Sequence, residues 1–501
     1  GTVLEDPKFG HRLLSFCRFA IEDMCKQPAS TLGTLPEAMV VALGDALRFC
    51  AALFPVMFNE GPRGMMDSIF AFLLRFASDS TLVSNPYIRA HLVKAMYGFI
   101  PTFRCASNSS SSHSPLDGSS AGRKDLVPFL MRFFIEIEQT GADDAFYTKF
   151  NHRFHVLTIL DYLWSLPAAP HKAAVRDLAR ERPRDLVRFI NMVLNDVHHC
   201  VGTGLEGVEE AHRIEQTGPE EGEGAIQAFM RQTDQRMRLE VIQRQCCFML
   251  EYSTGLLELL ERFSRTAPEA MGGGELGGRI ASLVASLLDR LVGPSCLDLK
   301  VKDPKLFHFD PRKVVCLCVK TFSLLASRTP SFLAACCADA PKLSKPLLDR
   351  TAELILRRNI LPPAELARFH RAVTRLTRAL EAAVNVDDLV EDAPEDFLDP
   401  IMQTIMRDPV VLPSSGVVVD RKVITRHLLS DAHDPFNRSP LTEEALTPKP
   451  ELRAQIEGFL RERLAEHGAV MLEGEAGLVV KANATFDHWS KEEEWEGEEE
   501  G

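Results

Sequence analysis

The feature that most constrains this sequence is a short, punctuated stretch near its carboxyl end, Glu395–Leu464. Two apolar runs that are rich in β-branched residues, Val410–Leu412 and Val417–Val419, lie on either side of the sequence Pro413-Ser-Ser-Gly416. Such runs are typical of strands, and a glycine between them is typical of a turn. The pattern therefore predicts a β-hairpin.

Two helices complete this stretch. Asp420 can accept hydrogen bonds from the first amides of a helix, which we expect from Arg421 to about Ser430. An irregular loop, Asp431–Ser439, follows, and Pro450 lies at the start of a last helix. The last helix has one apolar stripe, made by Leu452, Ile456, Phe459, Leu460 and Leu464.

A domain of roughly seventy residues often needs a disulfide or a metal to hold its loops. Neither is expected here, because all twelve cysteines lie at or before Cys337. The histidines of the expected domain, His427, His433 and His467, have no thiolate partners in it. Hydrogen bonds and ion pairs must therefore hold the loops. The available polar groups are Asp399, Asp408, Arg421, Asp434, Arg438 and Ser439.

Four ordered motifs in this stretch carry a family resemblance. They are Asp399-Pro-Ile-Met402, Met406-Arg-Asp-Pro409, Asp420-Arg-Lys422 and Asp434-Pro-Phe-Asn-Arg-Ser-Pro-Leu-Thr442. The series resembles the U-box, the RING-like module of ubiquitin ligases in which polar contacts replace zinc. It is most similar to the U-box of the ubiquitin conjugation factors that extend ubiquitin chains. The resemblance implies a small α+β domain without zinc.

The rest of the chain predicts helices and no strands of comparable strength. Apolar residues recur at three- and four-residue spacing between breaks at proline and glycine. The expected helical segments are 9–82, 88–97, 126–137, 146–166, 184–197, 225–263, 280–291, 314–325, 343–361 and 365–384. No repeat of fixed period is apparent. Serial helices with short breaks nevertheless suit an α-solenoid, so we predict armadillo-like helical repeats.

Composition suggests where the helices are interrupted. Ala106–Lys124 is rich in serine and predicts a disordered loop. Gly202–Gly224 is acidic and contains glycine, so we expect a connection there, and Met271–Gly274 predicts a flexible joint. The predicted domains are a helical solenoid at 1–388, a linker at 389–393, a U-box at 394–467 and an acidic disordered tail at 468–501.

The resemblance extends into the helical region, less tightly. Asn85–Arg89, Phe146–Asn151, Phe189–Asp196 and Leu299–Pro304 are similar to core segments of the chain-extending conjugation factors. The core of that family is longer than the residues that precede the U-box here. We therefore expect that its amino-terminal part is missing from this chain, which begins at Gly1 without a methionine.

The charge of the chain is concentrated in its tail. The net charge is -13, and residues 468–501 hold ten acidic and two basic residues, or -8, which leaves -5 for the rest. Nucleic-acid binding needs clustered Lys and Arg, so we expect no nucleic-acid partner. No apolar run is long enough to cross a bilayer, and no secretory signal is apparent. We expect a soluble protein with free thiols, in the cytoplasm and nucleus.

The resemblance also implies functional residues. Ile401, His427, Pro435 and Phe436 match positions that contact the conjugating enzyme, and Arg438 matches the residue that hydrogen-bonds both ubiquitin and that enzyme. A guanidinium suits this role because it offers several donors in a plane. Structural roles remain open: Ile401 and Phe436 in the core, His427 as a solvated helix residue, and Arg438 in an ion pair with Asp434.

One position departs from the family pattern. Gln403 stands where related modules often carry an aromatic or other apolar residue beside the docking groove. This difference is expected to alter the choice of conjugating enzyme and to leave the fold intact.

Other patterns suggest different chemistry more weakly. The run His198-His199-Cys200 could suggest a metal, but adjacent helical residues point in different directions. A thioester on Cys246, Cys316 or Cys336 would need an exposed thiol, whereas these cysteines lie in apolar runs. The acidic tail, with Trp489 and Trp495, could dock on a basic partner, although such tails are usually solvated.

By resemblance, the predicted activity is ubiquitin ligation that extends polyubiquitin chains on substrates bound for the proteasome. No nucleophile on this chain and no cofactor or metal are expected. Implied partners are a ubiquitin-charged conjugating enzyme, ubiquitin, ubiquitinated substrates and a hexameric segregase AAA ATPase. The competing hypotheses are a scaffold with an inert U-box and a helical-repeat receptor such as a transport adaptor. The ligase is favoured because the groove residues and Arg438 are all present.

Overall fold

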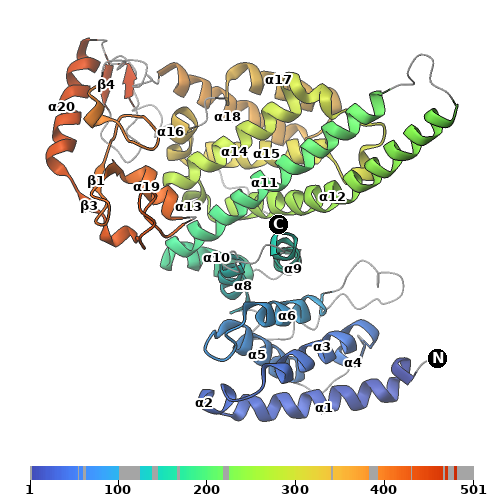
Figure 1. The fold of residues 1–501 in the computed structure, drawn as a ribbon. Helices are drawn as coiled ribbons and strands as arrows, with labels where there is room; N and C mark the ends of the chain where they lie inside the picture. The colour runs from blue at the N-terminus through green and yellow to red at the C-terminus, as the bar shows by residue number, and fades with distance from the viewer. Residues whose placement is uncertain are drawn as a thin grey trace. The chain divides into compact units, whose positions relative to one another are not determined.

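The computed structural model describes most of the chain (Figure 1). The described residues are 3–54, 56–59, 64–100, 125–137, 145–165, 170–217, 225–339, 342–382, 393–429, 431–466, 469–471 and 479–481. The chain divides into two compact units. The first unit comprises Gly1–Ala270 with Val301–Asp310, and the second comprises Met271–Lys300 with Pro311–Gly501.

The described part of the first unit is helical. Its α-helices are α1 (Pro7–Lys26), α2 (Ala29–Leu32), α3 (Glu37–Leu53), α4 (Val56–Asn59), α5 (Met65–Ser78), α6 (Pro86–Tyr97), α8 (Leu126–Glu136), α9 (Ala145–Ser165), α10 (Pro170–Glu181), α11 (Pro183–Gln216) and α12 (Ala225–Thr266). Short 3-10 helices are η1 (Val3–Glu5) and η6 (Pro304–Phe307). Asp6 caps α1, and its side chain accepts a hydrogen bond from the amide of Lys8. Asn85 caps α6 in the same way, with the amide of Tyr87 as donor. A proline follows each of these caps, at the first position of the helix.

Helices that are close in sequence are neighbours in this unit. α1 packs on α3 and α5, and α6 packs on α3, α5 and α9. α11 packs on α8, α10 and α12. The strongly apolar faces that the sequence predicted are buried in these contacts, as for Phe70, Phe72 and Phe76 of α5.

α11 and α12 run side by side as a helical hairpin (Figure 1). Since α11 continues to Gln216, the expectation of a connection beginning at Gly202 is wrong for the residues up to that point. A Cβ at Gly204 would lie 2.6 Å from Leu250, and a Cβ at Gly207 would overlap the Cys246 sulfur. These glycines allow two helices to approach closely, which a sequence pattern cannot distinguish from a loop.

The second unit begins with further helices. They are α14 (Gly274–Val292), α15 (Pro311–Arg328), α16 (Pro330–Asp339), α17 (Lys345–Arg358) and α18 (Pro363–Ala382), with η5 (Pro294–Leu299) after α14. α13 (Pro268–Gly272) ends just before them, so the predicted joint Met271–Gly274 consists of helix ends. A Cβ at Gly272 would lie 2.8 Å from the Thr329 side chain, and glycine therefore permits close packing there. α14 packs on α15, α16 and α17.

The carboxyl-terminal part of this unit combines short strands with helices. Its elements are η7 (Glu395–Phe397), β1 (Pro409–Val411), β2 (Val418–Asp420), α19 (Arg421–Leu428), η8 (Glu443–Ala445), β3 (Thr447–Pro448), α20 (Pro450–Glu466), β4 (Ala469–Met471) and β5 (Val479–Lys481). The strand order β2-β1-β3 makes an antiparallel sheet, and β4 pairs with β5. The expected lack of structure from residue 468 is therefore wrong for β4 and β5.

The fold class is confirmed at the coarse level: the chain is mostly helical, with one small α+β region near its carboxyl end. The armadillo-like arrangement and the domain boundaries stay predictions. The serine-rich segment 106–124, the linker residues 389–392, Trp489 and Trp495 lie outside the described residues. Within the described residues, no helix is both long and apolar enough to pass through a bilayer.

Candidate functional site

The predicted hairpin forms at the expected place. Val410 pairs with Val419 across β1 and β2, and the amide of Leu412 donates to the carbonyl of Val417 at 2.9 Å. Gly416 has φ +71°, a backbone conformation that strongly favours glycine. A turn of this geometry explains why glycine ends the Pro-Ser-Ser-Gly sequence.

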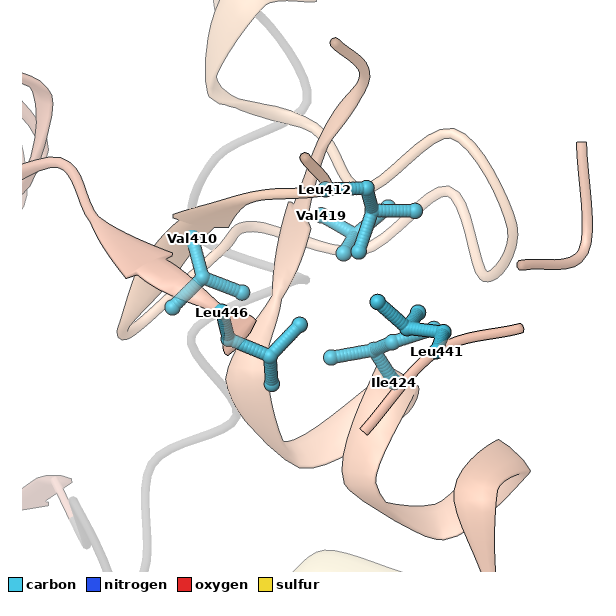
Figure 2. Packing of buried hydrophobic residues seen from close by; sticks show 6 residues of the cluster. All are labelled: Val410, Leu412, Val419, Ile424, Leu441 and Leu446. Atoms are coloured by element: carbon cyan, nitrogen blue, oxygen red, sulfur yellow. The ribbon is translucent and has the colours of Figure 1, made fainter. Parts of the chain in front are cut away.

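Two small apolar clusters support the site. Six buried residues, Val410, Leu412, Val419, Ile424, Leu441 and Leu446, converge in one of them (Figure 2). They come from β1 and the residue after it, from β2 and α19, and from the segments on either side of η8. The second cluster joins Ile405 and Met406 to Leu452, Ile456 and Leu460, which are stripe residues predicted for the last helix. With such limited apolar burial, polar contacts must determine the shape of the loops.

Asp399 anchors the first loop, Asp399–Thr404. Its carboxylate is fully buried and accepts hydrogen bonds from the amides of Ile401 at 2.9 Å and Met402 at 2.8 Å. The other carboxylate oxygen accepts from the amide of Asp420 at 2.7 Å. One carboxylate thus holds the loop in a tight turn and joins it to the residue that precedes α19.

Asp434 has the same role in the second loop, Asp431–Ser439. Its carboxylate accepts from the amide of Phe436 at 2.9 Å and from the hydroxyl of Ser414 at 2.6 Å. Burial alone would raise the pKa of Asp434, but the hydrogen bonds from Ser414, Phe436 and neighbouring groups outweigh it and hold the pKa below its usual value. The residue has no accessible surface.

Asp420 links both strands to α19. As predicted, it caps the helix, accepting from the amide of Lys422 at 2.8 Å. Its second oxygen accepts from the amides of Arg407 and Asp408, and Arg421 donates to the Asp408 carboxylate at 2.6 Å. The prediction that polar bonds hold these loops is confirmed for Asp399, Asp408, Arg421 and Asp434.

His427 connects α19 to the second loop. Its Nε2 lies 2.8 Å from the carbonyl oxygen of His433. Because a carbonyl only accepts, Nε2 carries the proton of this hydrogen bond. His433 in turn contacts the Asp431 carboxylate at 2.6 Å, and this hydrogen bond lowers the pKa of Asp431. His427 is therefore a structural link, and whether it also contacts a partner stays a prediction.

Arg438 has an unusual backbone and an exposed side chain. Its φ is +63°, and its amide donates to the carbonyl of Asp434 at 2.8 Å. The guanidinium lies 3.5 Å from Asp431, so the expected alternative of an ion pair with Asp434 is wrong in its partner. The side chain is 83% exposed, and an ion pair so exposed holds it only weakly. The Arg438 guanidinium is therefore exposed and only weakly restrained.

Gln403 also has a positive φ, of +57°. Among the described residues, four non-glycine residues have positive φ, and Gln403 and Arg438 contribute one to each docking loop. Backbone strain of this kind persists where the surrounding contacts over-determine it, and it is common at functional sites.

Each loop exposes large apolar side chains. In the described residues from 393 to 466, those exposed are Ile401 at 41%, Met402 at 53% and Phe436 at 45%. Ile401 and Phe436 are thus not core residues. Pro435, between Asp434 and Phe436, is half-buried. The sequence did not single out Met402 as a candidate site residue. Its amide, like that of Ile401, donates to the Asp399 carboxylate, and both side chains are exposed. Both loops bond to the α19 region, the first at Asp420 and the second at His427.

Comparison with known proteins identifies this arrangement. A family model described as ubiquitin elongating factor core matches residues 1–377, and a U-box domain model matches residues 393–465. The chain belongs to the ubiquitin elongating factor family. The first loop, Asp399–Thr404, and the second loop, Asp431–Ser439, both lie inside the matched U-box segment.

Several curated relatives are similar to this family member over most of the chain. Ubiquitin conjugation factor E4 of Schizosaccharomyces pombe is 30% identical over 86% of this chain and 42% of that protein. The probable ubiquitin conjugation factor E4 of Arabidopsis thaliana is 30% identical over 92% and 45%. E4 ubiquitin-protein ligase UFD2 of Saccharomyces cerevisiae is 31% identical over 77% and 40%. The chain spans less than half the length of these curated relatives.

The alternative chemistries find no support at the predicted positions. His199 stacks on Phe150, and burial raises the pKa of the neighbouring Cys200 thiol. Burial also raises the pKa of Cys246 to about 11, so this thiol is protonated at neutral pH. Cys336 is buried as well. Among the described residues, no group of three or more His, Cys, Asp or Glu is arranged to hold a metal ion.

Proposed function

We propose that this chain is a U-box ubiquitin ligase that binds a ubiquitin-charged conjugating enzyme and extends polyubiquitin chains on substrates bound for proteasomal degradation. One observation carries the proposal: two loops that expose apolar side chains are each fixed by a buried aspartate. A rigid apolar surface of this kind suits a protein partner better than a small substrate. Membership of the ubiquitin elongating factor family supports the same conclusion.

The chemistry requires no nucleophile on this chain. The conjugating enzyme brings ubiquitin as a thioester, and the attacking amine belongs to a ubiquitin already on the substrate. The sulfur leaves as the amine forms an isopeptide bond. The U-box accelerates this transfer by restricting the loaded enzyme to reactive geometries, which is catalysis by orientation.

The docking residues have distinct roles in this proposal. Ile401, Pro435 and Phe436 supply the apolar contacts with the conjugating enzyme, together with Met402. Arg438 donates hydrogen bonds to both ubiquitin and the conjugating enzyme, because its exposed guanidinium has several donors and only a weak ion pair to break. His427 maintains the second loop.

The helical region recruits the other partners in this proposal. Armadillo-like repeats over residues 1–388 would offer a long surface, and the packing of helices on near neighbours in sequence supports such repeats. Ubiquitinated substrates and a hexameric segregase AAA ATPase are the proposed partners, in the cytoplasm and nucleus. Direct binding of the purified ATPase to the chain tests this part.

A ubiquitination assay with a panel of conjugating enzymes tests the ligase activity. Chains should form with at least one enzyme, Ile401→Ala should abolish them, and Arg438→Ala should strongly reduce them. Leu356→Ala and Arg461→Ala are matched controls, since both side chains are exposed and lie outside the docking loops. Absence of chains with every enzyme would favour a scaffold with an inert U-box.

A further inference from the structure

Helix α18 carries a row of four arginines along one side. This arginine stripe comprises Arg368, Arg371, Arg375 and Arg378. At 3.6 residues per turn, the four positions lie within an arc of about 80° and extend over about 15 Å. Among the described side chains of α18, the one carboxylate is that of Glu365, and it pairs with Lys320 of α15 at 3.2 Å. The stripe therefore concentrates positive charge on one side of the helix.

The arginine stripe lies beside the packed face of α18. Phe369 and Leu376 of that face are fully buried, and they lie roughly 120–140° around the helix from the middle of the stripe. Arg371 and Arg378 are exposed, whereas the other two members are half-buried. The stripe thus borders the core of the second unit and opens to solvent.

Contacts inside the unit account for one of the four arginines. The Arg375 guanidinium donates to the carbonyl oxygen of Ser327 at 3.0 Å. Ser327 lies in the last turn of α15, and a cation is favourable at the carboxyl end of a helix. In the part of the chain that the structure describes, no carboxylate forms an ion pair with any member of the stripe. The other three guanidiniums therefore have no evident structural role.

The spacing within the arginine stripe is unfavourable for the helix by itself. Neighbouring members are three or four residues apart, and like charges at these distances repel each other and destabilise a helix. Other helices use the same spacing for attraction, as in the pairs Arg357–Glu353 of α17 and Arg453–Glu457 of α20. An anionic group bound along the stripe would remove this repulsion.

The chain itself contains a segment of matching charge. The 482–501 segment, which lies outside the described residues, holds eight acidic residues and one basic residue, or -7 of the net charge of -13. It also holds Trp489 and Trp495, two of the three tryptophans of the chain. An arginine guanidinium binds carboxylates and also stacks on an indole ring, so the segment offers both kinds of partner to the stripe.

The tether favours this segment over a free partner. Twenty residues follow Lys481, and when extended they can span up to about 70 Å. Lys481 and α18 belong to the same unit, and a compact unit of about 200 residues has a radius of gyration of about 16 Å. The segment can therefore reach any face of the unit. Tethering also gives it an effective concentration on the order of millimolar.

We infer that the arginine stripe is a docking surface for the 482–501 segment of the same chain. The glutamates bind the exposed guanidiniums of Arg371 and Arg378, and the tryptophans add stacking contacts. Because the attraction is between exposed charges, docking should weaken as the salt concentration rises. This inference is independent of the activity proposed for the U-box.

Competition by a peptide tests the inference in the full chain. The probe is a fluorescent peptide with the sequence of residues 482–501, and fluorescence anisotropy measures its binding. In a full-length variant, the seven glutamates from Glu492 to Glu500 are replaced by glutamine. This variant should bind the peptide at least about tenfold more tightly than the wild type, because its own segment no longer occupies the stripe. Equal binding to both proteins, or no binding to the variant, overturns the inference.

Charge reversal on α18 locates the site. Added to the glutamine variant, Arg371→Glu with Arg378→Glu should weaken peptide binding at least about tenfold, whereas Arg371→Lys with Arg378→Lys should retain most of it. The control is Arg176→Glu with Arg180→Glu, which makes the same change of charge at two exposed positions of α10. Circular dichroism verifies that the helices are intact. Binding that survives reversal on α18, or that the control weakens equally, overturns the inference.

Discussion

The carboxylate of Asp434 accepts a hydrogen bond from the hydroxyl of Ser414 at 2.6 Å, although the two residues lie in different loops. This contact joins the β1–β2 turn to the loop that carries Phe436 and Arg438. It has the effect that a zinc ion has in related RING modules, since it holds together segments that are distant in sequence. The first loop is held by Asp399 in the same manner.

Removing the Ser414 hydroxyl should loosen the second loop. Ser414→Ala removes one hydrogen bond from the buried Asp434 carboxylate. This loss should destabilise the second loop by about 1–3 kcal/mol. Hydrogen exchange of the Phe436 and Arg438 amides in the full chain should accelerate by about tenfold or more, because each 1.4 kcal/mol is about a factor of ten. Thr442→Ala, at an exposed position, is the control. Unchanged protection in Ser414→Ala would contradict this assignment.

Low pH should loosen the same loop. The pKa of Asp434 is lower in the folded protein than in the unfolded chain. Its carboxylate therefore contributes stability above the unfolded pKa, and this contribution is lost as the pH falls through the folded pKa. Protection of the Phe436 amide should decrease over that acidic range. Protection in Asp434→Asn should be low at neutral pH and depend less on pH.

Loss of the Asp399 carboxylate should disorder the first loop more severely. Asp399→Ala leaves the amides of Ile401, Met402 and Asp420 without their acceptor, which should cost about 3 kcal/mol or more. Limited proteolysis should cleave near residues 400–404 faster than in the wild type. Asp396→Ala, at an exposed position nearby, should leave the cleavage rate unchanged. Equal rates for the two variants would show that Asp399 does not anchor the loop.

A buried polar network in the first unit should be intolerant of single substitutions. Arg153 is fully buried and donates a hydrogen bond to one carboxylate oxygen of Asp196 at 2.6 Å. The hydroxyl of Tyr252 donates to the other Asp196 oxygen at 2.8 Å. Arg153→Met should destabilise this unit by about 3–5 kcal/mol, since Asp196 would keep a buried charge without its cation. Tyr252→Phe should cost about 1–3 kcal/mol.

Urea unfolding of the full chain measures both effects. Arg213→Met is the control, because Arg213 is exposed and pairs with Glu210 of its own helix. A shift of the unfolding midpoint in Arg153→Met no larger than in this control would be inconsistent with a network that stabilises the fold.

The first unit should also lose stability as the pH falls below neutral. The pKa of His155 is lowered from 6.5 to about 4. Burial is the largest cause, and the positive charges of His152, Lys94 and Arg48 add to it. The unfolded chain therefore binds a proton more readily, and up to about 3 kcal/mol of stability is lost between pH 6.5 and about 4. His155→Phe, which keeps a ring beside Tyr97, should reduce this dependence when unfolding is measured across the range. His11→Phe, at an exposed site, should retain the full dependence.

Features that depend on local sequence were predictable. The hairpin around Gly416 and the cap at Asp420 lie where the pattern placed them, because each is determined by a few neighbouring residues. The motif resemblance also pointed to Ile401, Phe436 and Arg438. The structure leaves all three exposed, and their contacts with partners stay predictions.

Features that depend on distant contacts were not predictable. Gly204 and Gly207 suggested a connection, but they are needed because α12 passes within contact distance of α11. The sequence offered Asp434 as the ion-pair partner of Arg438, whereas the fold brings Asp431 beside it. Met402 had no signal of its own, because exposure in an irregular loop follows no periodicity.

Single-turnover discharge of a ubiquitin-loaded conjugating enzyme onto free lysine tests the central claim most directly. The full chain should accelerate discharge at least about tenfold. Arg438→Ala should remove most of that acceleration while the Kd for the unloaded conjugating enzyme changes by less than about threefold, because orientation and docking are separate contributions. Discharge that the chain does not accelerate with any conjugating enzyme, or a loss in Arg438→Ala no greater than its loss of binding, would contradict the account.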